Sequence, residues 1–198
     1  MTSGVLQLPR PSTVITLLLT GFAVSAMVTK GLGTIWGVDV STKQIDVAIV
    51  AEDGTWQCNA CVFRQGKDPD PGERMQTIHS QWSSFAGALY EHFAPAFVFI
   101  ERPTGRFPAP TLMMTAGVVA AGTNHATSVP VEFVAVASWK KAIGLGGNAS
   151  KGVVRTWAEG RGGLITSQDA ADALGIAAYG CSVIDEWAAP VVMPAPNM

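Results

Sequence analysis

Cysteine is scarce in this chain, which has 198 residues but only Cys58, Cys61 and Cys181. Three thiols cannot supply the disulfide framework of small secreted domains, so the fold must depend on an apolar core. Cys58 and Cys61 have the spacing of half a zinc site, but no second pair exists and the three histidines show no matching spacing. Ordinary reduced thiols are the favoured interpretation, and a structural zinc is the weaker alternative.

Charged residues are also few, at 14% of the chain, whereas hydrophobic residues make up 48%. This composition is typical of a globular protein, and the length suits one domain with a substantial core. The net charge of the chain is -2, but its charges are unevenly distributed. Residues 102–161 contain seven basic and two acidic side chains, so this segment has a net charge of +5 and the rest of the chain has a net charge of -7. A local basic stretch suits a phosphodiester substrate, with a solvated surface as the alternative.

From residue 30 onward the pattern predicts one mixed α/β domain. Apolar runs bounded by turn residues predict strands at 35–41, 45–51, 55–64, 96–101 and 131–136. Apolar residues at three- and four-residue spacing predict a helix at 72–93, and an apolar run of small residues predicts another at 111–125. Residues 139–143, 151–159 and 168–186 are also predicted to be helical, with Gly-rich connections between them. Asp53-Gly54 predicts a hairpin turn between the second and third strands.

Four acidic residues stand at the ends of these elements. Asp39 lies inside the first apolar strand, Glu101 ends the fourth, and Asp169 and Asp172 open an Ala-rich helix. Any one of them has an ordinary explanation as a helix cap or a strand-end residue, but the set is harder to dismiss. Buried carboxylates need partners, and hard oxygen ligands suit Mg²⁺ or Mn²⁺. The sequence therefore predicts a metal site.

The expected chemistry follows from the repulsion among these carboxylates. Four of them cannot share one site without cations, since like charges a few ångströms apart repel by several kcal/mol. Two metal ions about 3.5–4 Å apart would remove that repulsion, activate water for attack on phosphorus and stabilise the leaving 3′ oxygen. Asp169 and Asp172 would project from one helical face, Asp39 would bridge both ions, and Lys151 would stabilise charge in the transition state.

Four motifs follow one another along the chain: Gly37-Val-Asp39-Val-Ser41, Phe99-Ile-Glu101, Ser138-Trp-Lys-Lys141 with the following segment 144–151, and Asp169-Ala-Ala-Asp172-Ala-Leu. In this order they resemble the motifs of the RuvC-type Holliday junction resolvases, in their phage or bacterial form, within the RNase H-like nuclease superfamily. The resemblance spans roughly residues 34–180. It implies an α/β protein with an RNase H-like fold, in which helices flank a mixed five-stranded sheet.

The resemblance also implies a function, that of a crossover junction endodeoxyribonuclease which cuts branched DNA as a homodimer with two Mg²⁺ ions per site, or with Mn²⁺. Asp39, Glu101, Asp169 and Asp172 would bind the metal and act in catalysis, with Lys151 near the scissile phosphate. The candidate DNA-binding residues are Arg102, Arg106, Lys140, Lys141 and Arg155. One departure from the family pattern is the Pro-rich loop 102–110, where a junction-probing loop would lie.

Several alternatives remain at this stage. An RNase H-like nuclease for RNA or an RNA–DNA hybrid would use the same acids, and a protein that binds DNA structures without cutting them would not need them. A phosphate loop of the sugar-kinase type at 37–42 would require two such domains, for which the chain is too short. A nucleotide-binding loop before Lys151 is also excluded, because the G-x-x-x-x-G-K-[ST] pattern is absent. Trp82 and Trp139 are more readily explained as core residues than as base-stacking platforms.

The ends of the chain are expected to lie outside the nuclease domain, which we assign to residues 30–187. Residues 14–28 form an apolar run of signal-peptide length, shorter than the roughly 20 residues of a membrane-spanning helix. Because export conflicts with a DNA-cleaving site, we expect either that the true start of the protein is Met27 or that residues 1–29 are an accessory extension. The protein would then be cytoplasmic, associated with the nucleoid and without a stable membrane partner, and residues 188–198 would be a flexible tail.

Overall fold

A computed structural model of the chain describes residues 33–64, 69–104 and 109–184. The predictions for residues 1–29, for the tail 188–198 and for Arg106 therefore lie outside the described residues. Within the described ranges, no helix has both the length and the apolar character needed to cross a bilayer.

The centre of the fold is a mixed five-stranded sheet in the order β3-β2-β1-β4-β5. Its strands are β1 (Thr34–Val40), β2 (Gln44–Ala51), β3 (Trp56–Val62), β4 (Pro95–Arg102) and β5 (Val131–Ala135). The first three strands pair antiparallel as a meander, whereas β4 pairs parallel to β1 and β5 pairs parallel to β4. The predicted mixed sheet is confirmed.

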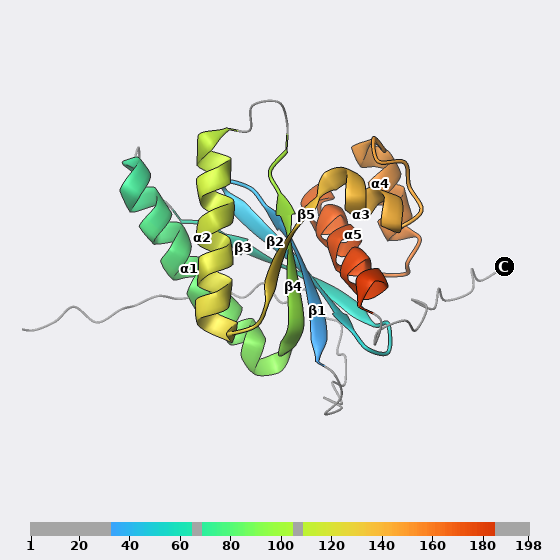
Figure 1. Cartoon of the computed structure of the whole chain (residues 1–198), viewed down its shortest axis with the longest axis horizontal. Helices are drawn as coiled ribbons and strands as arrows, with labels where there is room; N and C mark the ends of the chain where they lie inside the picture. Colours follow the sequence, from blue (N-terminus) through green and yellow to red (C-terminus); the bar gives the residue numbers. More distant parts are fainter. Residues whose placement is uncertain (1–32, 65–68, 105–108, 185–198) are drawn as a thin grey trace, which may run out of the picture.

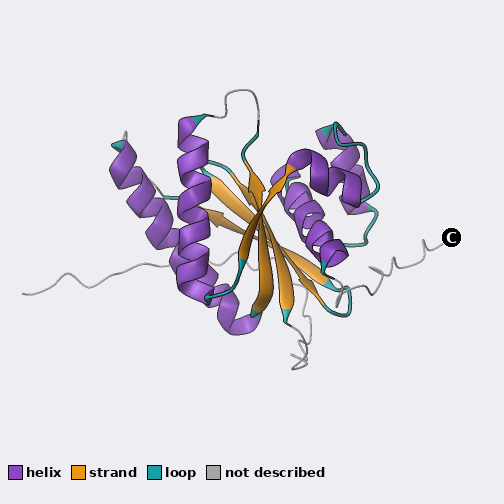
Figure 2. Cartoon of the chain, in the orientation of Figure 1, coloured by secondary structure: helices purple, strands orange, loops and turns teal. Residues whose placement is uncertain are grey.

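Helices cover both faces of this sheet (Figure 1; Figure 2). They are α1 (Pro71–His92), α2 (Pro110–Thr127), α3 (Val136–Ala142), α4 (Lys151–Glu159) and α5 (Gln168–Val183). Helices α1 and α2 lie side by side on one face, and α3, α4 and α5 lie on the other (Figure 1). The predicted end of the last helix at 186 is wrong, because the backbone of Ile184 is already extended and ends α5 at Val183.

Each strand of the sheet supplies side chains to two separate cores, since successive residues of a strand point to opposite faces. Trp36 and Val38 of β1 belong to the core beneath α1 and α2, and Ile35 belongs to the core beneath α5. The same alternation separates Cys61, in the first core, from Cys58, which packs against the second. Two thiols on opposite faces of one strand cannot hold one zinc ion, so this alternative is excluded.

The packing of α5 onto the sheet is unusually close at Gly37. A Cβ atom added there would lie 2.2 Å from the backbone nitrogen of Ala177 and 2.3 Å from the backbone oxygen of Ala173. Neighbouring backbone atoms cannot move aside as a flexible side chain would, so only glycine fits at this position of β1. Gly37 therefore fixes how near the helix comes to the strand that ends at the acidic cluster.

We predict that Gly37→Ala lowers the free energy of unfolding by about 1–3 kcal/mol or more, because the added methyl group must push α5 off the sheet. Gly117→Ala in α2 is the matched control, since a Cβ there meets no atom within 4 Å. The control should gain about 0.5–1 kcal/mol through helix propensity. Urea unfolding measures both changes, and equal stability of the two variants would contradict the close contact.

Candidate metal centre

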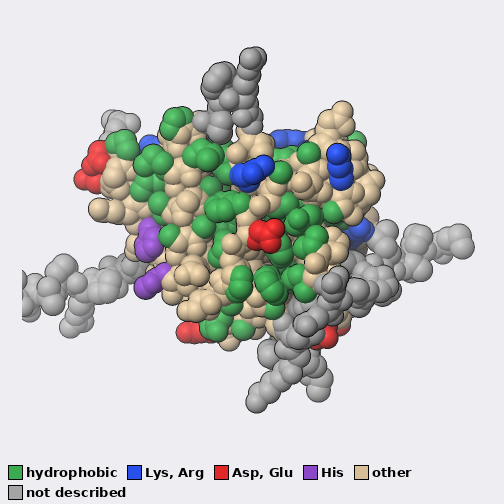
Figure 3. Space-filling model, in the orientation of Figure 1, with side chains coloured by type: hydrophobic (Ala, Val, Ile, Leu, Met, Phe, Trp, Pro, Cys, Tyr) green, Lys and Arg blue, Asp and Glu red, His purple; other side chains and the backbone are tan. Residues whose placement is uncertain are grey.

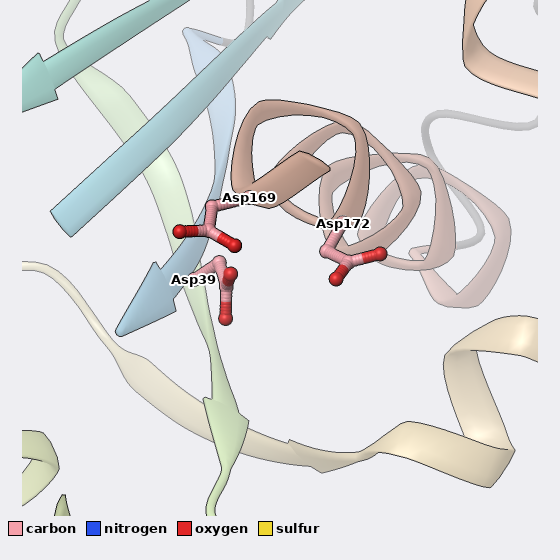
Figure 4. A group of neighbouring side chains, drawn as sticks. All are labelled: Asp39, Asp169 and Asp172. Carbon is pink, nitrogen blue, oxygen red and sulfur yellow. The ribbon is translucent and has the colours of Figure 1, made fainter. Parts of the chain in front are cut away.

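Three aspartates from two distant parts of the chain meet at one end of the sheet. Each of Asp39, Asp169 and Asp172 offers a carboxylate oxygen, and these oxygens lie within 4.8 Å of one another. Figure 4 shows Asp39 at the end of β1, beside Asp169 and Asp172 from the start of α5. The structure therefore brings together three of the four predicted metal-binding acids.

Local sequence explains why these side chains converge. Asp39 is two residues after Gly37, so its side chain leaves the same face of β1, toward α5. Helix α5 begins beside the strand with Ser167 as its N-cap, whose side chain accepts a hydrogen bond from the backbone N–H of Ala170. Asp169 and Asp172 are three residues apart near this helix start, and the exposed N–H groups of a first turn favour negative charge.

Glu101, the fourth predicted acid, lies beside this group but is held by a neighbour. It is next to last in β4, two residues after Phe99, which pairs with Gly37 of β1. Its Oε2 accepts a hydrogen bond of 3.0 Å from the indole Nε1 of Trp139. It does not belong to the group within 4.8 Å, yet its charge is close enough to raise the pKa of Asp39. One oxygen, Oε1, remains unbound by the indole.

Burial without compensating charge disturbs the titration of this cluster. Burial is the largest cause that raises the pKa of Asp39 well above its usual range, and repulsion from the surrounding carboxylates adds to it. Burial is also the first cause of the raised pKa values of Glu101 and Asp172. The positive charges of Lys140 and Lys151 oppose this rise for Glu101 and Asp172.

The predicted basic residues differ in how they relate to the cluster. Lys140 lies near the cluster, and its Nζ donates a hydrogen bond of 2.8 Å to the backbone oxygen of Ala149. Lys151 is the first residue of α4 and is exposed. Lys141 and Arg102 are exposed, and Arg155 pairs with Glu159 at 2.8 Å. The face drawn in Figure 3 shows few charged side chains: a small acidic group lies near its centre among apolar side chains, and basic side chains lie mainly in its upper part.

Sequence reasoning missed a fifth carboxylate, that of Asp46. It is 2% exposed and pairs directly with Asp39 across the β1–β2 ladder, so both side chains leave the same face. Burial raises its pKa, and its charge contributes to the raised pKa of Asp39. The available signal was an aspartate inside the otherwise apolar run 45–51.

Sequence reasoning also missed the bond between Trp139 and Glu101. Trp82 and Trp139 are both fully buried, as the core interpretation predicted. Trp139, however, also orients a carboxylate of the candidate site. No local pattern indicated this contact, which joins residues 38 positions apart.

The donor set fits a divalent cation. All the candidate ligand atoms are carboxylate oxygens, which Mg²⁺ and Mn²⁺ prefer. Octahedral coordination with metal–oxygen distances of about 2.1 Å places ligand oxygens about 3–4 Å apart, which is compatible with the spacing within 4.8 Å seen here. The raised pKa of Asp39 is what such a site shows when no positive charge balances its carboxylates.

No model of a known protein family matches the chain, and no curated protein matches it significantly. Among solved structures, RuvC of Thermus thermophilus superposes with a TM-score of 0.56 and 20% identity, over 75% of this chain and 93% of that one. T. thermophilus RuvC in complex with a Holliday junction substrate gives a TM-score of 0.56, 18% identity and the same shares of the two chains. The yeast mitochondrial Holliday junction resolvase Ydc2 has 12% identity and a TM-score of 0.48, over 75% of this chain and 77% of that one.

The two Thermus superpositions establish the fold of this chain. They cover most of both proteins, and the chain shares the mixed sheet flanked by helices. The predicted RNase H-like fold of the RuvC type is thereby confirmed.

We predict that Asp39→Asn makes the metal-free protein more stable at neutral pH. The neutral amide removes a charge that burial and neighbouring carboxylates disfavour. The melting temperature in EDTA should rise by about 2–4 °C for each kcal/mol gained, and the further rise on adding Mg²⁺ should disappear. Differential scanning calorimetry measures the melting temperature in EDTA and its change on adding Mg²⁺. The control Asp70→Asn, at the N-cap of α1, should leave both quantities as they are in the parent protein. A destabilised Asp39→Asn that keeps its Mg²⁺ response would refute the assignment.

We also predict that stabilisation by Mg²⁺ grows with pH. Raised pKa values mean that the stability contributed by protonated Asp39, Glu101 and Asp172 is present at low pH and is lost as pH rises through those values. The cation binds the deprotonated form, so it restores more stability at higher pH. Melting temperatures with and without Mg²⁺ from about pH 5 to 8 test this, and a pH-independent difference would argue against these ligands.

Proposed function

We propose that this protein is a divalent-metal-dependent endonuclease that cleaves branched DNA by phosphodiester hydrolysis and so resolves Holliday junctions. The observation that carries the proposal is the convergence of Asp39, Asp169 and Asp172 beside Glu101. Support comes from the shared fold, since one of the superposed Thermus structures is described as RuvC in complex with a Holliday junction substrate. The charge of Lys140 and Lys151 beside an acidic site also suits a phosphate substrate.

In this proposal the metal ligands are Asp39, Glu101, Asp169 and Asp172, and the ions are two Mg²⁺, which Mn²⁺ can replace. Bound cations would supply an activated water and stabilisation of the leaving oxygen. The charges of Glu101 in β4 and of Asp169 and Asp172 in α5 all act on Asp39, which makes it the residue suited to bridge two ions. Trp139 holds Oε2 of Glu101 and leaves Oε1 for coordination, which is the usual role of a group that orients a ligand.

The basic residues would hold the DNA backbone next to this centre. Lys151, exposed at the first turn of α4, is the candidate to stabilise charge on the phosphate under attack. Lys140, Lys141 and Arg102 would contact neighbouring phosphates. Arg155 would join them by exchanging its exposed partner Glu159 for a phosphate, since exposed ion pairs contribute little stability.

The wider organisation follows from the same proposal. Two symmetric nicks in a junction require two active sites, so we propose a homodimer. Residues 30–187 would be the nuclease domain, with residues 1–29 as an N-terminal extension and residues 188–198 as a tail. A protein with this substrate would act in the cytoplasm on DNA of the nucleoid.

The proposal predicts paired nicks in a labelled four-way junction incubated with the full chain and Mg²⁺. Linear duplex of the same sequence should remain uncut. Asp39→Asn should slow cleavage more than about 100-fold, beyond the usual effect of losing a group that only orients a metal ligand. Asp70→Asn, which removes a remote carboxylate, is the control and should cleave normally.

The other outcomes identify the alternatives. Cleavage of an RNA–DNA hybrid alone would retain the site and change the substrate. Junction binding without cleavage in Mg²⁺ or Mn²⁺ would indicate a protein that recognises DNA structure and does not cut it.

A further inference from the structure

Asp46 is a buried charged residue that the proposed function leaves without a role. Its Oδ2 accepts a hydrogen bond of 2.6 Å from Nε2 of Gln44, and its Oδ1 accepts one of 3.2 Å from Oγ of Ser167. Ser167 is 121 positions away in the sequence. The second bond therefore joins β2 directly to the beginning of α5.

Ser167 has a second hydrogen bond that depends on the first. Its Oγ accepts a bond of 2.9 Å from the backbone N–H of Ala170, which makes it the N-cap of α5. A hydroxyl has one proton to donate and lone pairs to accept with. An ionised carboxylate can only accept hydrogen bonds, so the hydroxyl proton of Ser167 points toward Asp46. A lone pair of the same hydroxyl oxygen is then left to accept the bond from the backbone N–H of Ala170. The two bonds also strengthen each other by polarisation.

The first turn of α5 is the part of the fold that determines the geometry of the candidate metal centre. Asp169 lies in this turn and Asp172 just beyond it, two and five residues after Ser167. A rotation of the helix start would therefore displace both carboxylates, and fraying of the first turn would displace Asp169. The body of the helix is held against β1 at Gly37, beyond Asp172 along the helix. The Asp46–Ser167 bond thus secures the end of the helix that carries the ligands.

Asp46 itself is poorly placed to be a ligand. It does not belong to the carboxylates whose oxygens lie within 4.8 Å of one another. Both of its oxygens already accept hydrogen bonds, from Gln44 and Ser167. Its influence on a cation would therefore pass through the helix that it orients.

We propose that Asp46 is a positioning residue that acts through Ser167 to set the first turn of α5 and thereby the affinity of Asp169 and Asp172 for a divalent cation. The inference deepens the proposed function and rests on it, because it assumes that this cluster is the metal centre. It concerns cation binding, which can be measured without DNA cleavage.

The test is Mn²⁺ binding to the full chain, followed by the electron paramagnetic resonance signal of free Mn²⁺. Asp46→Ala and Ser167→Ala should each weaken binding by about 10–100-fold, as is usual when a group that orients a metal ligand is lost. The double variant should bind no more weakly than either single one, because both substitutions break the same connection. Asp46→Asn should stay within about threefold of the parent, since its amide oxygen can accept from Ser167 and Gln44 can turn its own amide.

Asp70→Ala is the matched control, because it removes both a carboxylate and an N-cap, from α1 on the other face of the sheet. It should lower stability by about 1 kcal/mol, as Ser167→Ala should, and leave Mn²⁺ affinity unchanged. Melting temperatures and circular dichroism establish that every variant is folded. A loss of affinity in this control equal to that in Ser167→Ala would mean that general destabilisation explains the effect, and would overturn the proposal.

Three further results would overturn the inference. If Asp46→Asn bound as weakly as Asp46→Ala, the charge of Asp46 would act directly through space. If the losses of the single variants multiplied in the double variant, the two residues would act independently. A parent protein that bound no Mn²⁺ would overturn the metal centre together with this inference, whereas a parent that bound Mn²⁺ without cutting DNA would overturn the proposed function alone.

Discussion

The contact between α5 and β1 is the constraint on which the rest of the structure depends. Gly37 leaves no room for a side chain between the strand and the backbone of Ala173 and Ala177. The helix can lie this close because its buried face consists largely of alanine and glycine. Trp139 fills the space over Gly175 and from there reaches Glu101. Small residues on the helix thus bring three elements, β1, β4 and α5, to the distances at which their carboxylates interact.

That closeness has an electrostatic consequence. Carboxylates that are brought together and partly withdrawn from water favour protonation, as the raised pKa values of Asp39, Glu101 and Asp172 indicate. The core packing around them must hold this arrangement against its own repulsion. Such local instability within a well-packed fold is typical of sites whose residues are selected for chemistry and not for stability.

Much of this architecture could be predicted from the sequence, because its signals are local. Apolar runs, helical spacing and turn residues predicted all ten elements of the described chain, although α3 begins at Val136, which was predicted to end a strand. The order of four acids with their flanking motifs indicated the fold. The features that escaped prediction depend on register and packing between distant segments. The pairing of Asp46 with Asp39 requires the β1–β2 register, and the bond from Trp139 to Glu101 requires α3 to lie against β4. The close contact at Gly37 became evident only once α5 was placed on the sheet.

The two cores on either side of the sheet differ in the freedom they leave for evolutionary change. The core beneath α1 and α2 is built from large side chains such as Trp82, Phe85 and Leu89, which can be exchanged for others of similar total volume. The face beneath α5 meets backbone at Gly37, where no larger residue fits. Substitutions are therefore expected to be tolerated more readily in the first core than at Gly37 and in the part of α5 that packs on it. Such a protein can change much of its core and still keep this one contact between strand and helix.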